Sequence, residues 1–207
     1  MPKDTELANP EPIGLMGFAL TTFIVGLIEA DWLVSGAAIS AVIPLAIAYG
    51  GSIQLFAGLL AWRNGNTFAQ TAFLTYGAYW WWFALFELFS ANGWISPSAS
   101  LTTFGVISLG FGVVTLAWFV GALHLNMGLS AVFATLTLTY SLIGIGYWLD
   151  LGVLNVWGGY FALASALCAA YVAFATVTNW SAGRDMIPLG PAPLGMTDEE
   201  TSASQAD

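Results

Sequence analysis

Long apolar stretches separated by short polar breaks dominate the pattern of this chain. The breaks contain EADW at residues 29–32, RNGN at 63–66, ANGWISPSAS at 91–100, HLNMG at 124–128 and DLGVLN at 150–155. A helix needs about 20 mostly apolar residues to cross a bilayer, so the stretches between these breaks predict six membrane-spanning helices. Their expected bounds are 13–28, 34–62, 68–86, 101–123, 127–149 and 156–180.

The pattern therefore predicts an all-α integral membrane protein with a transmembrane domain over residues 13–180. Residues 1–12 form an N-terminal tail, and residues 181–207 form an acidic C-terminal tail. The second span is long enough to be tilted in the bilayer. The chain has no clear internal repeat, so the inverted-repeat architecture of many transporters gains no support.

Composition supports a membrane location and gives the spans a direction. Of the 207 residues 58% are hydrophobic and only 7% are charged, against about 25% charged in an average soluble domain. With six spans, the three basic residues Lys3, Arg63 and Arg184 all fall on the side of the two termini. Loops rich in Lys and Arg tend to stay in the cytoplasm. We therefore expect a multi-pass protein of the inner or plasma membrane with both termini cytoplasmic.

Several functions are excluded by what the sequence lacks. The single cysteine, Cys168, and the single histidine, His124, cannot form a multi-residue metal site or a bis-histidine haem site. No Lys falls inside a span and no P-loop motif occurs. The chain has no basic patch, so nucleic acid is not an expected partner. We expect no cofactor, no metal and no enzymatic reaction.

Neutral polar residues inside the spans leave two interpretations open. Gln54 lies in the middle of the second span, on a stripe with Ala46, Gly50 and Gly58. An unpaired amide in hydrocarbon is costly, so Gln54 either faces a lumen or bonds a neighbouring helix. Glu29 and Glu87 lie near the outer span ends, where reaching water is favoured over a relay role. These residues fit either a pore for a small solute or a structural or assembly protein.

Three stretches, taken together, point to a family. They are NPEPIGLMGF at 9–18, YGGSIQLFAGL at 49–59 and GNTFAQTAFLTYGAYWW at 65–81. In this order and spacing they closely resemble the acetate uptake transporter family, the succinate–acetate permeases of bacteria, archaea and fungi. The resemblance covers the whole membrane region and extends to RDMIPLG at 184–190.

The resemblance implies six helices around a pore within each subunit and a ring-shaped homohexamer in the lipid bilayer. It implies conduction of acetate and, in some members, succinate or other short carboxylates. The family's hydrophobic constriction corresponds here to Phe18, Tyr76 and Leu136. The family's Asn-Pro motif corresponds to Asn9, Pro10 and Pro12, and its amide corresponds to Gln54, which makes these residues substrate-binding candidates. We add Thr21 and Thr75 as substrate-binding candidates because they are polar residues inside the predicted spans.

The opening motif has a simple physical role beside the implied one. Proline fits the first turn of a helix, and Asn9 can cap the free N–H groups. The same N–H groups and the helix dipole favour a carboxylate. Glu11 stands where the family usually has a small residue, and we expect it to point into the cytoplasm or pair with a neighbour. Thr75 and Tyr79 stand where relatives often have Ser and Phe, which leaves the substrate range open.

Two alternatives remain beside a carboxylate permease. One is a channel for another small solute such as water or ammonia, and the other is a membrane sensor or assembly factor without transport. The residues do not decide between a channel and a proton-coupled carrier.

Overall fold

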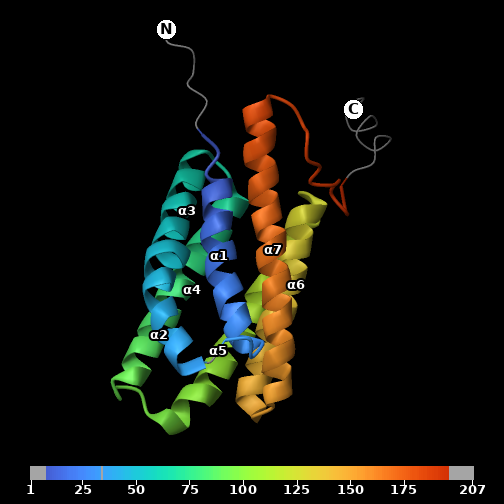
Figure 1. The fold of residues 1–207 in the computed structure, drawn as a ribbon. Coiled ribbons are helices and arrows are strands. Elements are labelled where there is room, and N and C mark those ends of the chain that lie inside the picture. Colours follow the sequence, from blue (N-terminus) through green and yellow to red (C-terminus); the bar gives the residue numbers. More distant parts are fainter. Residues whose placement is uncertain (1–7, 34, 196–207) are drawn as a thin grey trace.

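Six long helical segments cross the molecule from end to end (Figure 1), and the computed structural model describes residues 8–33 and 35–195. They are α1 (Glu11–Glu29), the continuous α2 (Ser35–Leu45), η1 (Ala46–Ile53) and α3 (Gln54–Arg63), then α4 (Thr67–Ala91), α5 (Pro97–Ala122), α6 (Met127–Leu149) and α7 (Gly152–Ala182). Each predicted span coincides with one of these segments, so the six-helix prediction is confirmed. By length and composition, five of them could cross a membrane; the remaining one, α4, has 25 residues and is richer in Tyr and Trp.

The helices begin where the sequence offers caps. Asn66 Oδ1 accepts a hydrogen bond from the Ala69 N–H at 3.0 Å at the start of α4. Asn126 Oδ1 does the same for Leu129 at 2.8 Å at the start of α6. A cap of this kind satisfies an N–H that no helical carbonyl can reach.

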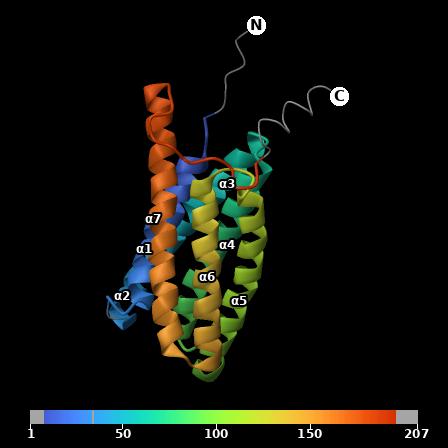
Figure 2. The same cartoon turned by 90° about the vertical axis from the view of Figure 1, so that its right-hand side faces the viewer.

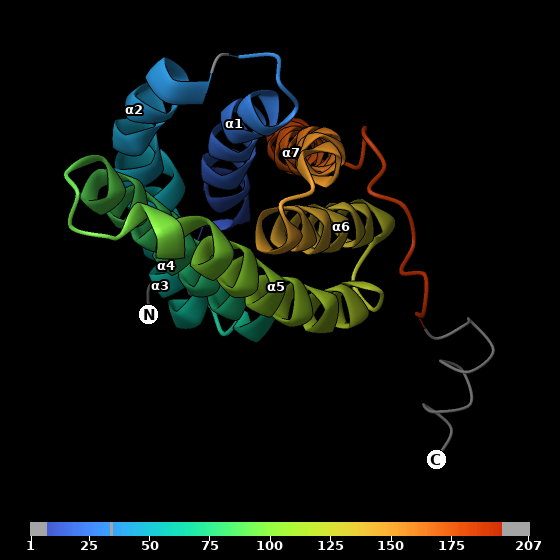
Figure 3. The same cartoon turned by 90° about the horizontal axis from the view of Figure 1, so that it is seen from below.

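The six segments run side by side (Figure 2), and the view along the bundle shows that they surround a common centre (Figure 3). The packed neighbours follow the order α4, α3 with η1, α1, α7, α6 and α5. The start of α1 and the end of α7 lie at the same end of the bundle (Figure 1). The fold therefore places the inward faces of all six segments around one axis.

Small residues let the helices approach closely. Gly159 of α7 lies against the α1 backbone, where an added Cβ would be 2.4 Å from the Ala30 nitrogen. At Gly105 of α5, an added Cβ would be 2.6 Å from the Trp148 nitrogen. Lipid provides no hydrophobic drive for helix association, so close van der Waals packing of this kind carries it.

The second segment contains a π-helix, which the sequence did not predict. η1 follows Pro44, and the Ser52 hydroxyl donates to the Ile47 carbonyl five residues earlier at 2.7 Å. Gly50 lies against Thr21 and Trp80, and an added Cβ would come within 2.9 Å of each. The wider helix keeps its backbone groups paired, as a membrane interior requires.

The described part of the expected C-terminal tail runs back along α6 and α7 (Figure 1). The Leu194 N–H donates to the Leu123 carbonyl at 2.8 Å, and the Gly128 N–H donates to the Leu189 carbonyl at 2.9 Å. The Tyr171 hydroxyl donates to the Pro188 carbonyl at 2.6 Å. Lys3 and the acidic residues after position 195 lie outside the described residues.

Candidate functional site

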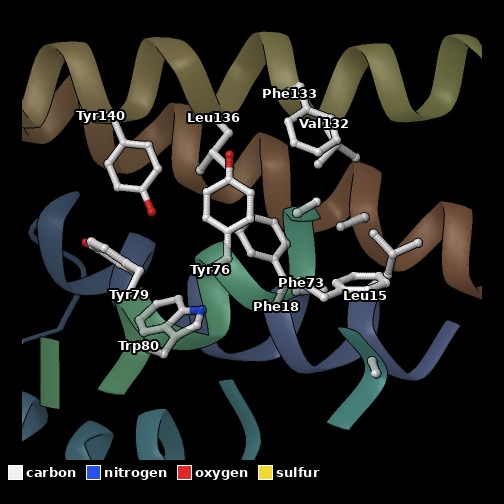
Figure 4. Packing of buried hydrophobic residues seen from close by; sticks show 14 of the residues in the cluster. Leu15, Phe18, Phe73, Tyr76, Tyr79, Trp80, Val132, Phe133, Leu136 and Tyr140 are labelled. Carbon is white, nitrogen blue, oxygen red and sulfur yellow. The ribbon is translucent and has the colours of Figure 1, made fainter. Parts of the chain in front are cut away.

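Three side chains from three helices meet at the centre of the bundle (Figure 4). Phe18 comes from α1, Tyr76 from α4 and Leu136 from α6, and their exposed fractions are 4%, 3% and 2%. The Phe18 and Tyr76 ring centroids are 6.1 Å apart and tilted by 52°. We call these three residues the neck. The structure thus brings together the three residues that the family resemblance implied as a constriction.

Three small cavities follow one another through the bundle, and neighbouring cavities share lining residues. The middle cavity, ≈ 20 Å³, is lined by all three neck residues, Gln54 and others. The inner cavity, ≈ 30 Å³, shares Leu15, Phe73 and Phe133 with it and is also lined by Glu11. The outer cavity, ≈ 30 Å³, shares Phe18 and Leu136 with it and is also lined by Glu29. We call this succession of cavities the path.

The path is closed to anything much larger than water. A cavity of this volume holds one or two water molecules, since one water needs about 10–15 Å³ by the same measure. The neck side chains must therefore move before any solute larger than water can pass. Rotamer changes of aromatic and leucine side chains are the smallest motions that could open it.

Tyr76 is held in the neck by a directional hydrogen bond. The Thr115 hydroxyl donates to the Phe111 carbonyl at 2.7 Å, so its single proton is used there. Tyr76 Oη lies 2.8 Å from Thr115 Oγ1 and is therefore the donor. The Tyr76 ring also stacks on Tyr140 with centroids 6.5 Å apart. The ring consequently has a fixed position from which it narrows the path.

The inner mouth carries the Asn-Pro motif and Glu11. Asn9 Oδ1 accepts a hydrogen bond from the Glu11 N–H at 2.9 Å, as a capping residue does. Asn66 donates to Glu11 Oε1 at 2.7 Å, so Glu11 pairs with a neighbour as expected. Glu11 also lines the inner cavity. Asn9, Pro10 and Pro12 are not among the lining residues of the three cavities; they shape the start of α1.

The other binding candidates lie in different surroundings. Gln54 is 1% exposed, lines the middle cavity and has no hydrogen-bond partner for Oε1 among the described residues. The Thr21 hydroxyl donates to the Gly17 carbonyl of its own helix at 2.9 Å. Thr75 is half-buried and, like Thr21, does not line the path. Of these three candidates, only Gln54 lines the path.

The outer cavity contains polar residues that the sequence analysis did not assign to a site. Thr22, Glu29 and Trp80 line it together with Tyr79 and Tyr140. Phe18, Thr22, Val25 and Glu29 are spaced by four, three and four residues, which places them on one face of α1. This spacing is the signal that could have identified the outer cavity once Phe18 was suspected.

Within the described residues, no group of three or more His, Cys, Asp or Glu side chains could hold a metal ion.

Six helices around a central row of cavities define a multi-pass membrane protein with a path through its own bundle. Comparison with known proteins identifies the family of this chain. The model of the GPR1/FUN34/yaaH family matches residues 1–194, so the chain belongs to this family.

Several relatives have been named for transport. The succinate-acetate/proton symporter SatP of Escherichia coli (strain K12) is 35% identical over 187 residues, covering 90% of this chain and 97% of SatP. Acetate permease A of Emericella nidulans is 32% identical over 213 residues, covering 93% of this chain and 69% of the permease. Ammonia transport outward protein 3 of Saccharomyces cerevisiae is 32% identical over 178 residues, covering 84% of this chain and 64% of that protein.

A solved structure has the same fold. The bacterial acetate channel SatP aligns with a TM-score of 0.83 at 34% sequence identity, covering 89% of this chain and 99% of the channel. The predicted family resemblance and the six-helix fold are confirmed by these matches.

Proposed function

We propose that this protein is a membrane channel or permease for acetate and related short-chain carboxylates, including succinate as a candidate substrate. The observation that carries the proposal is the path, a row of cavities through one subunit that narrows at Phe18, Tyr76 and Leu136. The names of the bacterial and fungal relatives support the substrate class. No covalent chemistry is involved, and the protein is not an enzyme.

The neck favours a small solute that sheds part of its water. Its walls are one phenyl ring, one phenol and one isobutyl group, which cannot replace the hydration of a charged group. The Gln54 amide beside it offers two donors to a carboxylate. A neutral donor holds an anion without the deep binding that a buried guanidinium would give. The methyl group of acetate can meanwhile pass against the apolar side chains.

We place the protein in the cell membrane with both termini in the cytoplasm and expect it to assemble into a homohexamer in the bilayer. Arg63 is the last residue of α3 and Arg184 follows α7, and both helices end where α1 begins (Figure 1). The positive-inside tendency supports this orientation. Native mass spectrometry of the detergent-solubilised protein would measure the subunit number.

The experiment is uptake of labelled acetate into proteoliposomes, with and without an imposed pH gradient. Empty liposomes give the background, because neutral acetic acid crosses lipid unaided. Uptake above background without a gradient would identify a passive conduit, and accumulation only with the gradient would identify proton-linked transport. An absence of uptake in both conditions, from folded protein, would contradict the proposal.

One observation favours a second candidate, the ammonium ion. Glu11 lines the inner cavity and Glu29 lines the outer cavity, so carboxylates flank the neck on both sides. Carboxylates attract cations, and aromatic rings such as those of the neck bind them by cation–π interaction. Two relatives in Saccharomyces cerevisiae carry ammonia transport in their names. Labelled methylammonium in the same proteoliposomes distinguishes the two, since a carboxylate permease would leave it at background.

A further inference from the structure

A carboxylate lines the small space that lies directly beyond the neck. Glu29 is the last residue of α1 and is half-buried. It lines the outer cavity together with Phe18 and Leu136, and this cavity measures only ≈ 30 Å³. Any solute that leaves the neck on this side therefore comes within contact distance of Glu29.

The neighbours of Glu29 do not neutralise a negative charge. The Tyr147 hydroxyl of α6 donates to its two oxygens at 3.1 and 3.2 Å. The titratable groups that face it are otherwise Tyr79 and Glu87 of α4 and Asp31 after α1, so its charged neighbours are acidic.

The remaining sides of Glu29 are uncharged, with Asn155 of α7 beside it and Phe104 of α5 in the cavity wall. Among the described residues, Arg63 and Arg184 lie at the other end of the bundle (Figure 1). Glu29 consequently has hydrogen-bond donors but no cation.

The same cavity otherwise suits an anion. Thr22 Oγ1 and Trp80 Nε1 both belong to side chains in its wall, and neither atom has a hydrogen-bond partner among the described residues. Each can donate to a carboxylate. Only an ionised Glu29 opposes a negative charge here, whereas a protonated Glu29 would add an O–H donor.

We propose that Glu29 makes the path pH-dependent: the outer cavity accepts a substrate carboxylate when Glu29 is protonated and rejects it when Glu29 is ionised. The proton on Glu29 and the substrate anion then occupy one cavity at the same time, which links entry of the anion to binding of a proton. This inference rests on the proposed carboxylate permease. It assigns the pH dependence to one residue of α1.

The test compares labelled acetate uptake by the full-length protein and by Glu29→Gln in proteoliposomes. Uptake is measured from about pH 5 to about pH 8, a range that lies above the ordinary pKa of a glutamate and includes the range where buried carboxyls titrate. Wild-type uptake, after subtraction of empty liposomes, should fall steeply with pH, and Glu29→Gln uptake should not. The ratio of variant to wild type should rise by about tenfold or more across the range, because the repulsion of two nearby charges is removed.

Two further variants make the result specific. Glu87→Gln removes a nearby carboxylate that does not line the cavity, so its uptake should still fall with pH, with the profile moved toward more acidic pH because a like charge facing Glu29 is gone. Tyr147→Phe removes the hydrogen bonds that favour ionised Glu29, so its uptake should persist to more alkaline pH than that of the wild type. This variant also tests the inference if Glu29→Gln fails to fold.

The outcomes separate the two proposals. Wild-type pH profiles in both Glu29→Gln and Tyr147→Phe would overturn the role of Glu29 while leaving the permease intact. Loss of uptake by folded Glu29→Gln at every pH would also overturn it, because the carboxylate would then be needed rather than inhibitory. Background uptake by the wild type at every pH would overturn the proposed function, and the role of Glu29 with it.

Discussion

Replacing Leu136 by alanine tests whether the neck selects substrates by size. Leu136 is 2% exposed and separates the middle cavity of ≈ 20 Å³ from the outer cavity of ≈ 30 Å³. An engineered apolar cavity of about 150 Å³, made by removing one leucine side chain from a protein core, holds a benzene-sized guest. If the surroundings stay in place, Leu136→Ala joins the cavities into a space of roughly 100–150 Å³.

The expected effect is a loss of discrimination rather than a loss of transport. One methylene in an apolar pocket changes selectivity by about 10- to 200-fold. Butyrate has two methylenes more than acetate, so we expect the acetate-to-butyrate ratio to fall by at least about tenfold. The cost in folding free energy should be about 2–5 kcal/mol, as for other buried leucines.

Competition of unlabelled acids with labelled acetate uptake in proteoliposomes measures this ratio. Leu138→Ala is the matched control, because Leu138 lies on the same helix with an exposed fraction of 44%. An unchanged ratio in folded Leu136→Ala would refute the assignment of the neck. An equal change in Leu138→Ala would show that the effect does not come from the path.

Three further predictions concern packing and hydrogen bonding. Gly159→Ala should lower the free energy of unfolding by about 1–3 kcal/mol, because the added Cβ would press on the backbone at the end of α1. Gly110→Ala is the control, since a Cβ added there has no atom within 4 Å, and its stability in a thermal unfolding assay should be close to that of the wild type. Tyr76→Phe should lower the free energy of unfolding by about 1 kcal/mol and keep acetate uptake, because the ring stays and the Thr115 hydroxyl still donates to the Phe111 carbonyl. A loss of uptake would show that the Tyr76 hydroxyl itself contacts the solute. Asn66→Ala should cost about 1–2 kcal/mol in the same unfolding assay through loss of the α4 cap and of the bond to Glu11, and a stability equal to the wild type would contradict the role of this cap.

The sequence predicted the spans well because the bilayer imposes a strong and simple constraint. About 20 apolar residues between polar breaks leave few alternatives, and the six predicted segments differ from the observed helices by a few residues at most ends. The largest shift at a helix start is four residues, as at Gly152, where α7 begins before the expected start of the last span. The π-helix over Ala46–Ile53 was not predictable, because it depends on how Gly50 and Gly51 fit against tryptophans of α4.

The candidate site also contains residues that the sequence predicted and residues that only the structure revealed. The motifs that contain Phe18, Gln54 and Tyr76 led, through the family resemblance, to residues that line the middle cavity together. The threonines of α1 could not be sorted from the sequence: Thr21 bonds its own helix while Thr22, one residue later, faces the outer cavity. One residue corresponds to 100° around a helix, so only the packing of α1 decides which threonine meets the path.

Glu29 shows most clearly what tertiary structure adds. From the sequence, a carboxylate at a span end is expected to reach for water. In the fold, Tyr147 and the outer cavity surround it instead, because α7 packs against α1 and α6 packs against α7, which brings Tyr147 of α6 within hydrogen-bond distance of Glu29. The apolar pattern determined the six long helical segments of a multi-pass membrane protein, since hydrophobic length is a local property of the sequence. Which polar groups face the path was decided by the packing of six helices around one axis, because that depends on contacts between residues more than one hundred positions apart.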